Sequence, residues 1–141
     1  MPQINETVFD PELEAARKFF AGDLYATRAT GIVIDAVGEN SARCSLRLDE
    51  RHKNAVGQVM GGVMFTLADF VFAVSTNRGA SPTVTVTSVI SYLNPVKGSS
   101  LTASSRLVKD GKRTCFYQID ISDDLGTPVA VVSVTGAHLA G

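Results

Sequence analysis

The sequence is poor in the residue types that build redox and metal sites, and neither sign of charge is in excess. It contains two cysteines, two histidines and no tryptophan, and its 13 basic and 14 acidic side chains give a net charge of -1. Cys44 and Cys115 stand far apart outside any ligand motif, which excludes a disulfide scaffold and a zinc site and fits a reducing compartment. A nucleic-acid-binding domain would carry a basic stripe. We therefore expect a cytoplasmic protein with no metal, no cofactor and no nucleic-acid partner.

Long apolar runs are missing as well. The longest, from Val63 to Val74, is too short to cross a bilayer and contains Asp69. The first twenty residues lack the basic segment and apolar run of a secretory signal. Because 45% of the 141 residues are hydrophobic, the chain can bury one core. We expect a single domain over residues 1–141 and no membrane partner.

The N-terminal third predicts one helix and two strands. Asp10 and Pro11 form a helix-start signal, and apolar residues follow at helical spacing as far as Leu24. Residues 41–49 then alternate apolar and polar side chains with the period of a half-buried strand. An earlier apolar run, residues 32–37, is expected to pair with that strand across a short turn.

The remainder predicts one long helix and a set of strands. The segment GGVMFTLADFVFAVSTN, residues 61–77, has apolar side chains on every side of a helical wheel, so it must be buried nearly all round. Four strand patterns follow, at residues 83–93, 101–109, 115–122 and 129–134. Consecutive strands joined by tight turns, such as Asp110-Gly111, form an antiparallel sheet. The predicted fold is of the α+β class, with the sheet curled around the single buried helix.

Two adjacent glycines, Gly61 and Gly62, stand where the long helix begins. The first backbone N–H groups of a helix have no intrahelical acceptor, and the macrodipole is positive there, so a carbonyl or oxyanion can be held by them. The alternative is that the glycines only let the loop pack tightly against a neighbour. The sequence leaves both interpretations open.

Asp69 is the only ionisable side chain between Met60 and Asn77. A carboxylate on an apolar helix is either hydrogen-bonded in a structural role or placed in a pocket for chemistry. Gly61 and Asp69 are eight positions apart, which is roughly 12 Å along a helix, so the two cannot act on one reacting atom within one chain. If both are catalytic, we expect a two-fold dimer in which each site combines the helix start of one chain with the acid of the other.

Motifs of other catalytic classes are absent. The sequence has no G-x-S-x-G elbow, no phosphate-binding G-x-x-x-x-G-K-[ST] loop and no metal-ligand cluster. His52 lies in a polar loop and His138 near the end of the sequence, and we expect both to be solvated, which leaves triad chemistry unsupported. Cys44 and Cys115 fall on apolar strand faces and are expected in the core.

The stretches NAVGQVMGGVMFTLADF and SYLNPVKGSSLTASSRLVKDGKRTCFYQIDI resemble the PaaI-type acyl-CoA thioesterases of the hotdog superfamily. The spacing G-G-x-x-x-x-L-x-D, here Gly61, Gly62, Leu67 and Asp69, is fairly specific to this branch, and the resemblance runs from about Gly31 to the C-terminus. It implies the hotdog fold, an antiparallel sheet wrapped around one long helix, and hydrolysis of an acyl-CoA.

The resemblance also implies functions for individual residues. The acid at Asp69 acts as general base or nucleophile, Asn54 and the amide of Gly61 hold the carbonyl oxygen, and Thr85 assists the water. These functions are divided across a dimer interface. The family usually has His before the glycine pair, whereas this chain has Met60, whose thioether neither titrates nor donates a hydrogen bond.

The leading hypothesis is therefore a homodimeric, or dimer-of-dimers, thioesterase for aromatic or medium-chain acyl-CoA. A non-catalytic acyl-CoA or fatty-acyl binding protein is the alternative, and a hotdog-type hydratase is weaker because no His stands near Asp69 in the sequence. Met60 and Gly62 are expected beside the substrate. Lys112 and Arg113, with Lys97 and Lys109, either meet the phosphates of CoA or are solvated charges at the ends of the hairpins.

Overall fold

The computed structural model describes residues 10–79 and 82–140. Its core is one six-stranded antiparallel sheet packed on a long helix, α2 (Gly61–Thr76), as the sequence predicted. The strands are β1 (Val33–Gly38), β2 (Ser41–Arg47), β3 (Thr83–Tyr92), β4 (Ser100–Asp110), β5 (Thr114–Asp123) and β6 (Pro128–His138). Their order across the sheet is β1-β2-β4-β5-β6-β3. Within the described residues, no helix is both long enough and apolar enough to cross a membrane.

The first helix, α1 (Pro11–Phe20), starts as predicted but ends early. The carboxylate of Asp10 accepts hydrogen bonds from the backbone N–H groups of Glu12 and Leu13, which caps the helix. Leu24, expected on its apolar face, lies beyond the helix and is 58% exposed. The chain leaves the helix at Gly22, a poor helix former, and re-forms as one π-helical turn, η1 (Tyr25–Ala29).

The strand pairing follows from the turns. β1 and β2 form the predicted hairpin, with Asn40 at a φ of 54°, the left-handed conformation that Asn tolerates best after Gly. β4, β5 and β6 form a meander, and β6 also pairs with β3. β6 extends four residues past the predicted end at Val134, because its ladders with β3 and β5 continue beyond the apolar run that marks the strand in the sequence.

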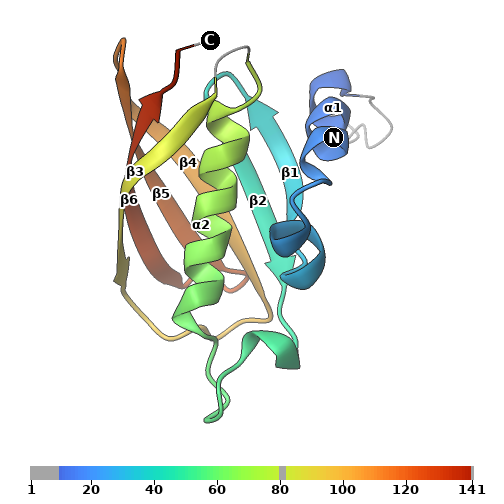
Figure 1. Ribbon diagram of the computed structural model, residues 1–141. Coiled ribbons are helices and arrows are strands. Elements are labelled where there is room, and N and C mark those ends of the chain that lie inside the picture. The colour runs from blue at the N-terminus through green and yellow to red at the C-terminus, as the bar shows by residue number, and fades with distance from the viewer. Residues whose placement is uncertain (1–9, 80–81, 141) are drawn as a thin grey trace, which may run out of the picture.

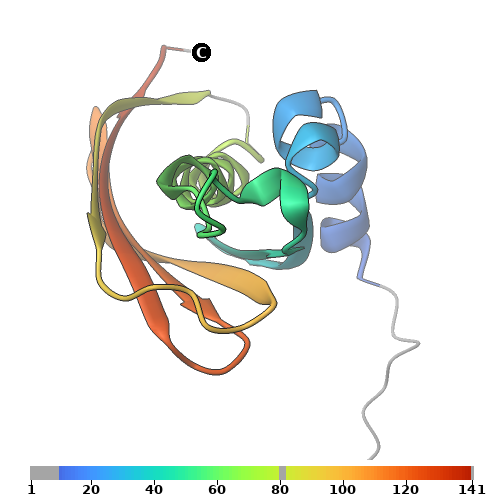
Figure 2. The same cartoon turned by 90° about the horizontal axis from the view of Figure 1, so that it is seen from below.

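The sheet curls around α2, and the helix contacts all six strands (Figures 1 and 2). Side chains on the sheet side of the helix, such as Leu67, Val71 and Val74, are fully buried. α1 and η1 lie beside β1 and complete the wall on that side. The structure therefore has the hotdog arrangement that the resemblance implied.

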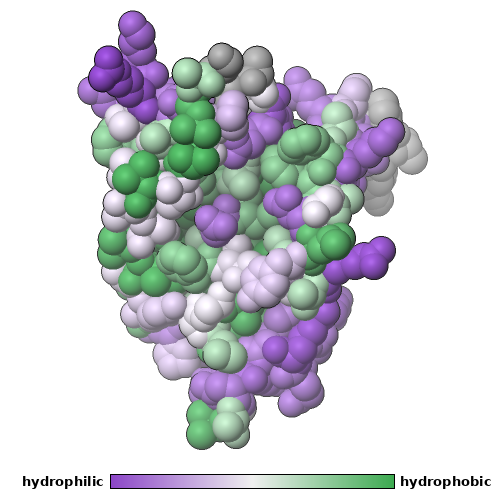
Figure 3. Space-filling model, viewed as in Figure 1, coloured by the Kyte–Doolittle hydropathy of each residue, from purple (hydrophilic) through white to green (hydrophobic). Residues whose placement is uncertain are grey.

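The prediction that α2 is buried nearly all round is wrong for this chain. Gly62, Phe65 and Asp69 form an exposed stripe, because the sheet covers only one side of the helix. The edge strand β3 beside this stripe is largely exposed as well, including Val84, Val86 and Val89. Figure 3 shows this face, with hydrophobic side chains over β3 and along α2, interrupted by hydrophilic ones over the middle of the helix.

Candidate active site

A small hairpin leads the chain into α2. The backbone N–H of Met60 donates to the carbonyl of His52 at 2.9 Å, Lys53 pairs with Val59, and the N–H of Asn54 donates to the carbonyl of Gln58 at 2.7 Å. At the tip, Gly57 has a φ of 82°, a conformation that glycine adopts without strain. These hydrogen bonds hold Asn54 in a defined position relative to the start of α2.

Asn54 uses only part of its side chain to build this hairpin. Its Oδ1 accepts hydrogen bonds from the N–H groups of Val56, at 3.1 Å, and Gln58, at 3.0 Å. No acceptor for its Nδ2 is found among residues 10–79 and 82–140. The amide nitrogen of Asn54 is thus a positioned donor that is free for a ligand.

The start of α2 leaves two backbone donors free. Met60 is the N-cap residue and makes no side-chain cap, and within the described chain no group accepts from the N–H of Gly61 or Gly62. The two glycines differ in what surrounds them. A Cβ on Gly62 would meet nothing within 4 Å, whereas one on Gly61 would lie 2.6 Å from the hydroxyl of Tyr92. Gly61 is therefore required by close packing and Gly62 opens onto free space.

Asp69 is the last residue of the exposed stripe and lies on the wall of a cavity of about 280 Å³. The cavity is also lined by Asp23, Tyr25 and Thr66. Partial burial, and secondly the negative charge of Asp23, raise the pKa of Asp69 above its ordinary value. In the described part of the chain no hydrogen bond or ion pair reaches the Asp69 carboxylate. A carboxylate with a structural role would be hydrogen-bonded or ion-paired, whereas the carboxylate of Asp69 is unpaired.

Met60 lines a second cavity, of about 200 Å³, together with Gly62. This cavity shares Tyr25 and Thr66 with the cavity at Asp69. The two cavities therefore adjoin at Tyr25 and Thr66.

The structure does not bring all the expected site residues together within one chain. Gly61 and Asp69 are both on α2, roughly 12 Å apart by helical rise. Thr85 is exposed on the edge strand β3, next to a bulge, and makes no hydrogen bond with Asp69. Lys112 and Arg113 lie at the tip of the β4–β5 hairpin, at the C-terminal end of α2 and far from Gly61 (Figure 1).

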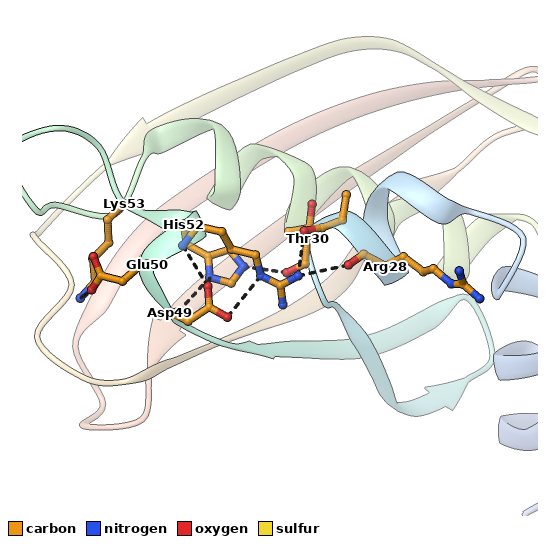
Figure 4. Close-up of polar contacts among 8 residues, drawn as sticks. Arg28, Thr30, Asp49, Glu50, His52 and Lys53 are labelled. Carbon is orange, nitrogen blue, oxygen red and sulfur yellow. Dashed lines mark hydrogen bonds and ion pairs between the residues drawn. The ribbon is translucent and has the colours of Figure 1, made fainter.

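His52 is not solvated, contrary to the prediction. Its ring is 2% exposed, with Nδ1 accepting from the backbone N–H of Asp49 at 3.0 Å and Nε2 lying 2.7 Å from the carbonyl of Thr30 (Figure 4). Since Nδ1 is an acceptor, Nε2 carries the proton and donates to Thr30. The three-residue spacing from Asp49 to His52 is a capping-box spacing, around the short helix η2 (Glu50–His52), and is the signal that would have predicted it.

His138 is not a free surface histidine either. Its Nδ1 lies 2.9 Å from Oγ1 of Thr83 and its Nε2 lies 2.7 Å from Oδ1 of Asp110. These residues come from the ends of β3, β4 and β6, so the histidine joins three strands. The Thr83 residue is 5% exposed, so its hydroxyl is shielded from a substrate. The contacts of His138 with Thr83 and Asp110 therefore stabilise the ends of the three strands.

The cysteines lie in the core, as predicted. Cys44 and Cys115 are both buried. Burial, and secondly the charge of Asp35, raise the pKa of Cys44 to about 12, so it remains an unreactive thiol. Within residues 10–79 and 82–140, no three His, Cys, Asp or Glu side chains converge in a way that suits a metal ion.

The comparisons with known proteins agree on one family. The sequence model described as Thioesterase superfamily matches residues 56–130, more than half of the chain. The acyl-coenzyme A thioesterase PaaI of Escherichia coli K12 is 30% identical over 115 residues, which cover 81% of this chain and 82% of that protein. The human acyl-coenzyme A thioesterase 13 is 33% identical over 84 residues, which cover 57% of this chain and 59% of the human protein. The chain thus spans less than two thirds of the length of that human relative.

Solved structures share the fold. The E. coli PaaI protein from the phenylacetic acid degradation operon superposes with a TM-score of 0.79 at 26% identity, covering 92% of this chain and 97% of that one. A thioesterase from Haemophilus influenzae superposes with a TM-score of 0.80 at 24% identity, covering 94% of this chain and 92% of that one. The chain therefore belongs to the thioesterase superfamily and has the hotdog fold of its PaaI-type members.

Proposed function

We propose that the protein is a thioester hydrolase that cleaves acyl-CoA with an aromatic or medium-chain acyl group. The observation that carries the proposal is the unpaired carboxylate of Asp69 on the open face of α2, the helix whose first two N–H groups are free. Family membership and the names of the two acyl-coenzyme A thioesterase relatives support this reaction class.

Asp69 acts as the general base. It takes a proton from water as the water oxygen attacks the thioester carbon, and the carbonyl oxygen becomes an oxyanion. When the carbonyl re-forms, the carbon–sulfur bond breaks and the CoA thiolate leaves with the proton held by Asp69. The raised pKa of Asp69 makes it a better proton acceptor at neutral pH than an ordinary Asp. Thr85 orients the water, and direct attack by Asp69 to form an anhydride is the mechanistic variant.

The oxyanion is received by the N–H of Gly61 and the amide nitrogen of Asn54. Donors already in place when charge develops supply a large part of catalysis in acyl transfer. Both groups belong to the hairpin and helix start, and neither has a competing acceptor in the described chain. The side chain of Met60 cannot donate a hydrogen bond to the oxyanion, so the backbone N–H of Gly61 and the amide of Asn54 supply more of its stabilisation.

The site is divided between two chains of a homodimer. The separation of Gly61 and Asp69 along α2 supports this division, since the two cannot act on one atom within one chain. The exposed apolar side chains on α2 and β3, including Phe65, Val86 and Val89, supply a surface that a second copy would bury. With the two helices antiparallel across a two-fold axis, Asp69 of one chain meets the helix start of the other. Pairing of these dimers into a tetramer is compatible with this arrangement.

The same symmetry would place the tip of the β4–β5 hairpin near the active site of the partner chain. Lys112 and Arg113 lie at the C-terminal end of α2 in their own chain and, with antiparallel helices, toward the helix start of the partner. Two cations there would suit the phosphates of CoA.

The decisive test is steady-state hydrolysis of a panel of acyl-CoA substrates by wild type and Asp69→Asn. We expect the variant to lose about two or more decades in kcat. Asp120→Asn, at an exposed carboxylate on β5, is the matched control and should keep wild-type rates. Comparable rates for wild type and Asp69→Asn would contradict the proposal, and tight binding with no turnover of any acyl-CoA would favour a non-catalytic binding protein.

A further inference from the structure

Tyr92, the last residue of β3, touches the start of α2. β3 runs back along the helix, so its end returns to the level of Gly61 (Figure 1). A Cβ built on Gly61 would lie 2.6 Å from the Tyr92 hydroxyl oxygen and 2.8 Å from the ring carbon that bears it. Because that Cβ is one bond from Cα, the hydroxyl oxygen lies within roughly 4 Å of the Gly61 Cα.

The hydroxyl of Tyr92 has no partner of its own. Among residues 10–79 and 82–140, no group accepts its proton or donates to its oxygen, and the residue is 54% exposed. The buried Tyr117 differs, because its hydroxyl is occupied by donating to the carbonyl of Asn40. Tyr92 therefore points a free donor at the place where two free backbone donors already stand.

The same hydroxyl opens onto a cavity of about 490 Å³, a size typical of small-molecule sites. Gly61, Tyr92, Gln58 and Asn94 give it polar groups, and Val59, Met64, Leu93 and Pro95 supply apolar walls. A ligand that fits has one carbonyl oxygen near the helix start and an apolar group extending from it. The acyl part of an acyl thioester has this shape.

We propose that Tyr92 is a further catalytic residue, whose hydroxyl donates a hydrogen bond to the thioester carbonyl oxygen beside the N–H of Gly61. This inference rests on the proposed thioesterase function. Tyrosine hydroxyls serve as oxyanion donors in other acyl-transfer sites. The acyl group then lies along Val59 and Leu93, which selects apolar and aromatic acyl groups over charged ones.

The test is Tyr92→Phe, which keeps the ring packed on Gly61 and removes only the hydroxyl. We expect kcat to fall about 10- to 100-fold while KM stays within about twofold, because the hydrogen bond strengthens as charge develops on the oxygen. The matched control is Tyr117→Phe, which removes a phenol hydroxyl that bonds to Asn40 and packs on Phe72, away from the helix start. Its kcat should equal that of wild type even if its melting temperature falls.

The outcomes separate this inference from the function on which it rests. A Tyr92→Phe kcat within twofold of wild type, with Asp69→Asn inactive, overturns the inference and leaves the thioesterase function standing. A rise in KM at unchanged kcat also overturns it, since that result assigns Tyr92 to substrate binding alone. Absence of turnover by wild type on every acyl-CoA overturns both. Melting curves of each variant verify that the folded protein is being compared.

Discussion

At the scale of single residues, the environment of Asp69 sets the pH range of the proposed reaction. A base must be ionised to accept a proton, so kcat/KM should rise with pH through the pKa of Asp69, which lies above that of an ordinary Asp. Asp23 is the other carboxylate on the cavity wall, and its negative charge disfavours ionisation of Asp69.

We therefore predict that Asp23→Asn shifts the acidic limb of the pH profile. Removing the charge of Asp23 lowers the pKa of Asp69, so the limb should move to lower pH while the plateau rate stays close to that of wild type. The measurement is kcat/KM from about pH 3 to pH 8, an interval that starts about one unit below the ordinary pKa of an Asp side chain. A limb that stays in place, or moves to higher pH, would show that Asp23 does not act on the catalytic base.

The sequence alone singles out residues whose chemistry is visible without the fold. An acid on an apolar helix and a glycine pair at its start are unusual locally, and both lie where the structure leaves charge and N–H groups unpaired. The prediction for His138 is wrong because its partner Thr83 is distant in sequence, whereas for His52 the distant partner is Thr30 and the local capping-box spacing from Asp49 was overlooked. Tyr92 was present in the S-Y-x-x-P motif, but its contact with Gly61 depends on how β3 lies against α2.

At the scale of elements, the β5–β6 turn is held by a single carboxylate. Oδ2 of Asp123 accepts from the N–H groups of Lys97 and Gly98, and its Oδ1 accepts from those of Leu125 and Thr127. Removal of the carboxylate from water works to raise its pKa, but the hydrogen bonds from Lys97, Thr127 and Gly98 prevail and hold the pKa of Asp123 well below its usual range.

This lowered pKa has a defined consequence for stability. The carboxylate has a lower pKa in the folded chain than in the unfolded one, so its contribution is fully present above the unfolded pKa of about 4 and is lost as the pH falls toward the folded value. We predict that Asp123→Asn lowers the free energy of unfolding at pH 7, and that the difference from wild type shrinks toward pH 3. Urea denaturation at both pH values measures it, with Asp120→Asn as control. An equal difference at the two pH values would rule out the carboxylate as the cause.

Elements with a regular alternation of apolar and polar side chains are predicted well from the sequence. Irregular elements are predicted poorly. The strands and α2 were recognised because apolar periodicity reflects the burial of each face. The π-helical turn at Tyr25–Ala29 was not predicted, since the helical spacing of apolar residues was followed only as far as Leu24. The exposed stripe on α2 was read as core because sequence periodicity reports which side chains avoid water, not which protein chain covers them.

At the scale of the whole molecule, the exposed stripe and the divided site have one explanation. An apolar helix with an uncovered side, an apolar edge strand beside it, and two halves of a catalytic site roughly 12 Å apart on α2 all fit a second copy docked on this face. The spacing of Gly61 and Asp69 predicts such a dimer, and the dimer stays a prediction. The exposed face of β3 could not be predicted from the sequence, because β3 has the pattern of an ordinary half-buried strand.

The most direct test of the divided site is complementation between two inactive variants. Asn54→Asp keeps the oxygen that accepts from Val56 and Gln58 but loses the nitrogen donor, so the hairpin should remain intact while the oxyanion loses a partner. Asp69→Asn removes the base. Each homodimer is expected to be nearly inactive. A heterodimer purified through two different affinity tags would contain one site with both functional groups intact and one with neither.

If the site is shared across the dimer, this heterodimer recovers about half of the wild-type acyl-CoA hydrolysis rate, because one of its two equivalent sites is restored. Heterodimer activity no higher than that of the two variant homodimers would mean that Asn54 and Asp69 act within the same chain, and would contradict a site shared across the dimer.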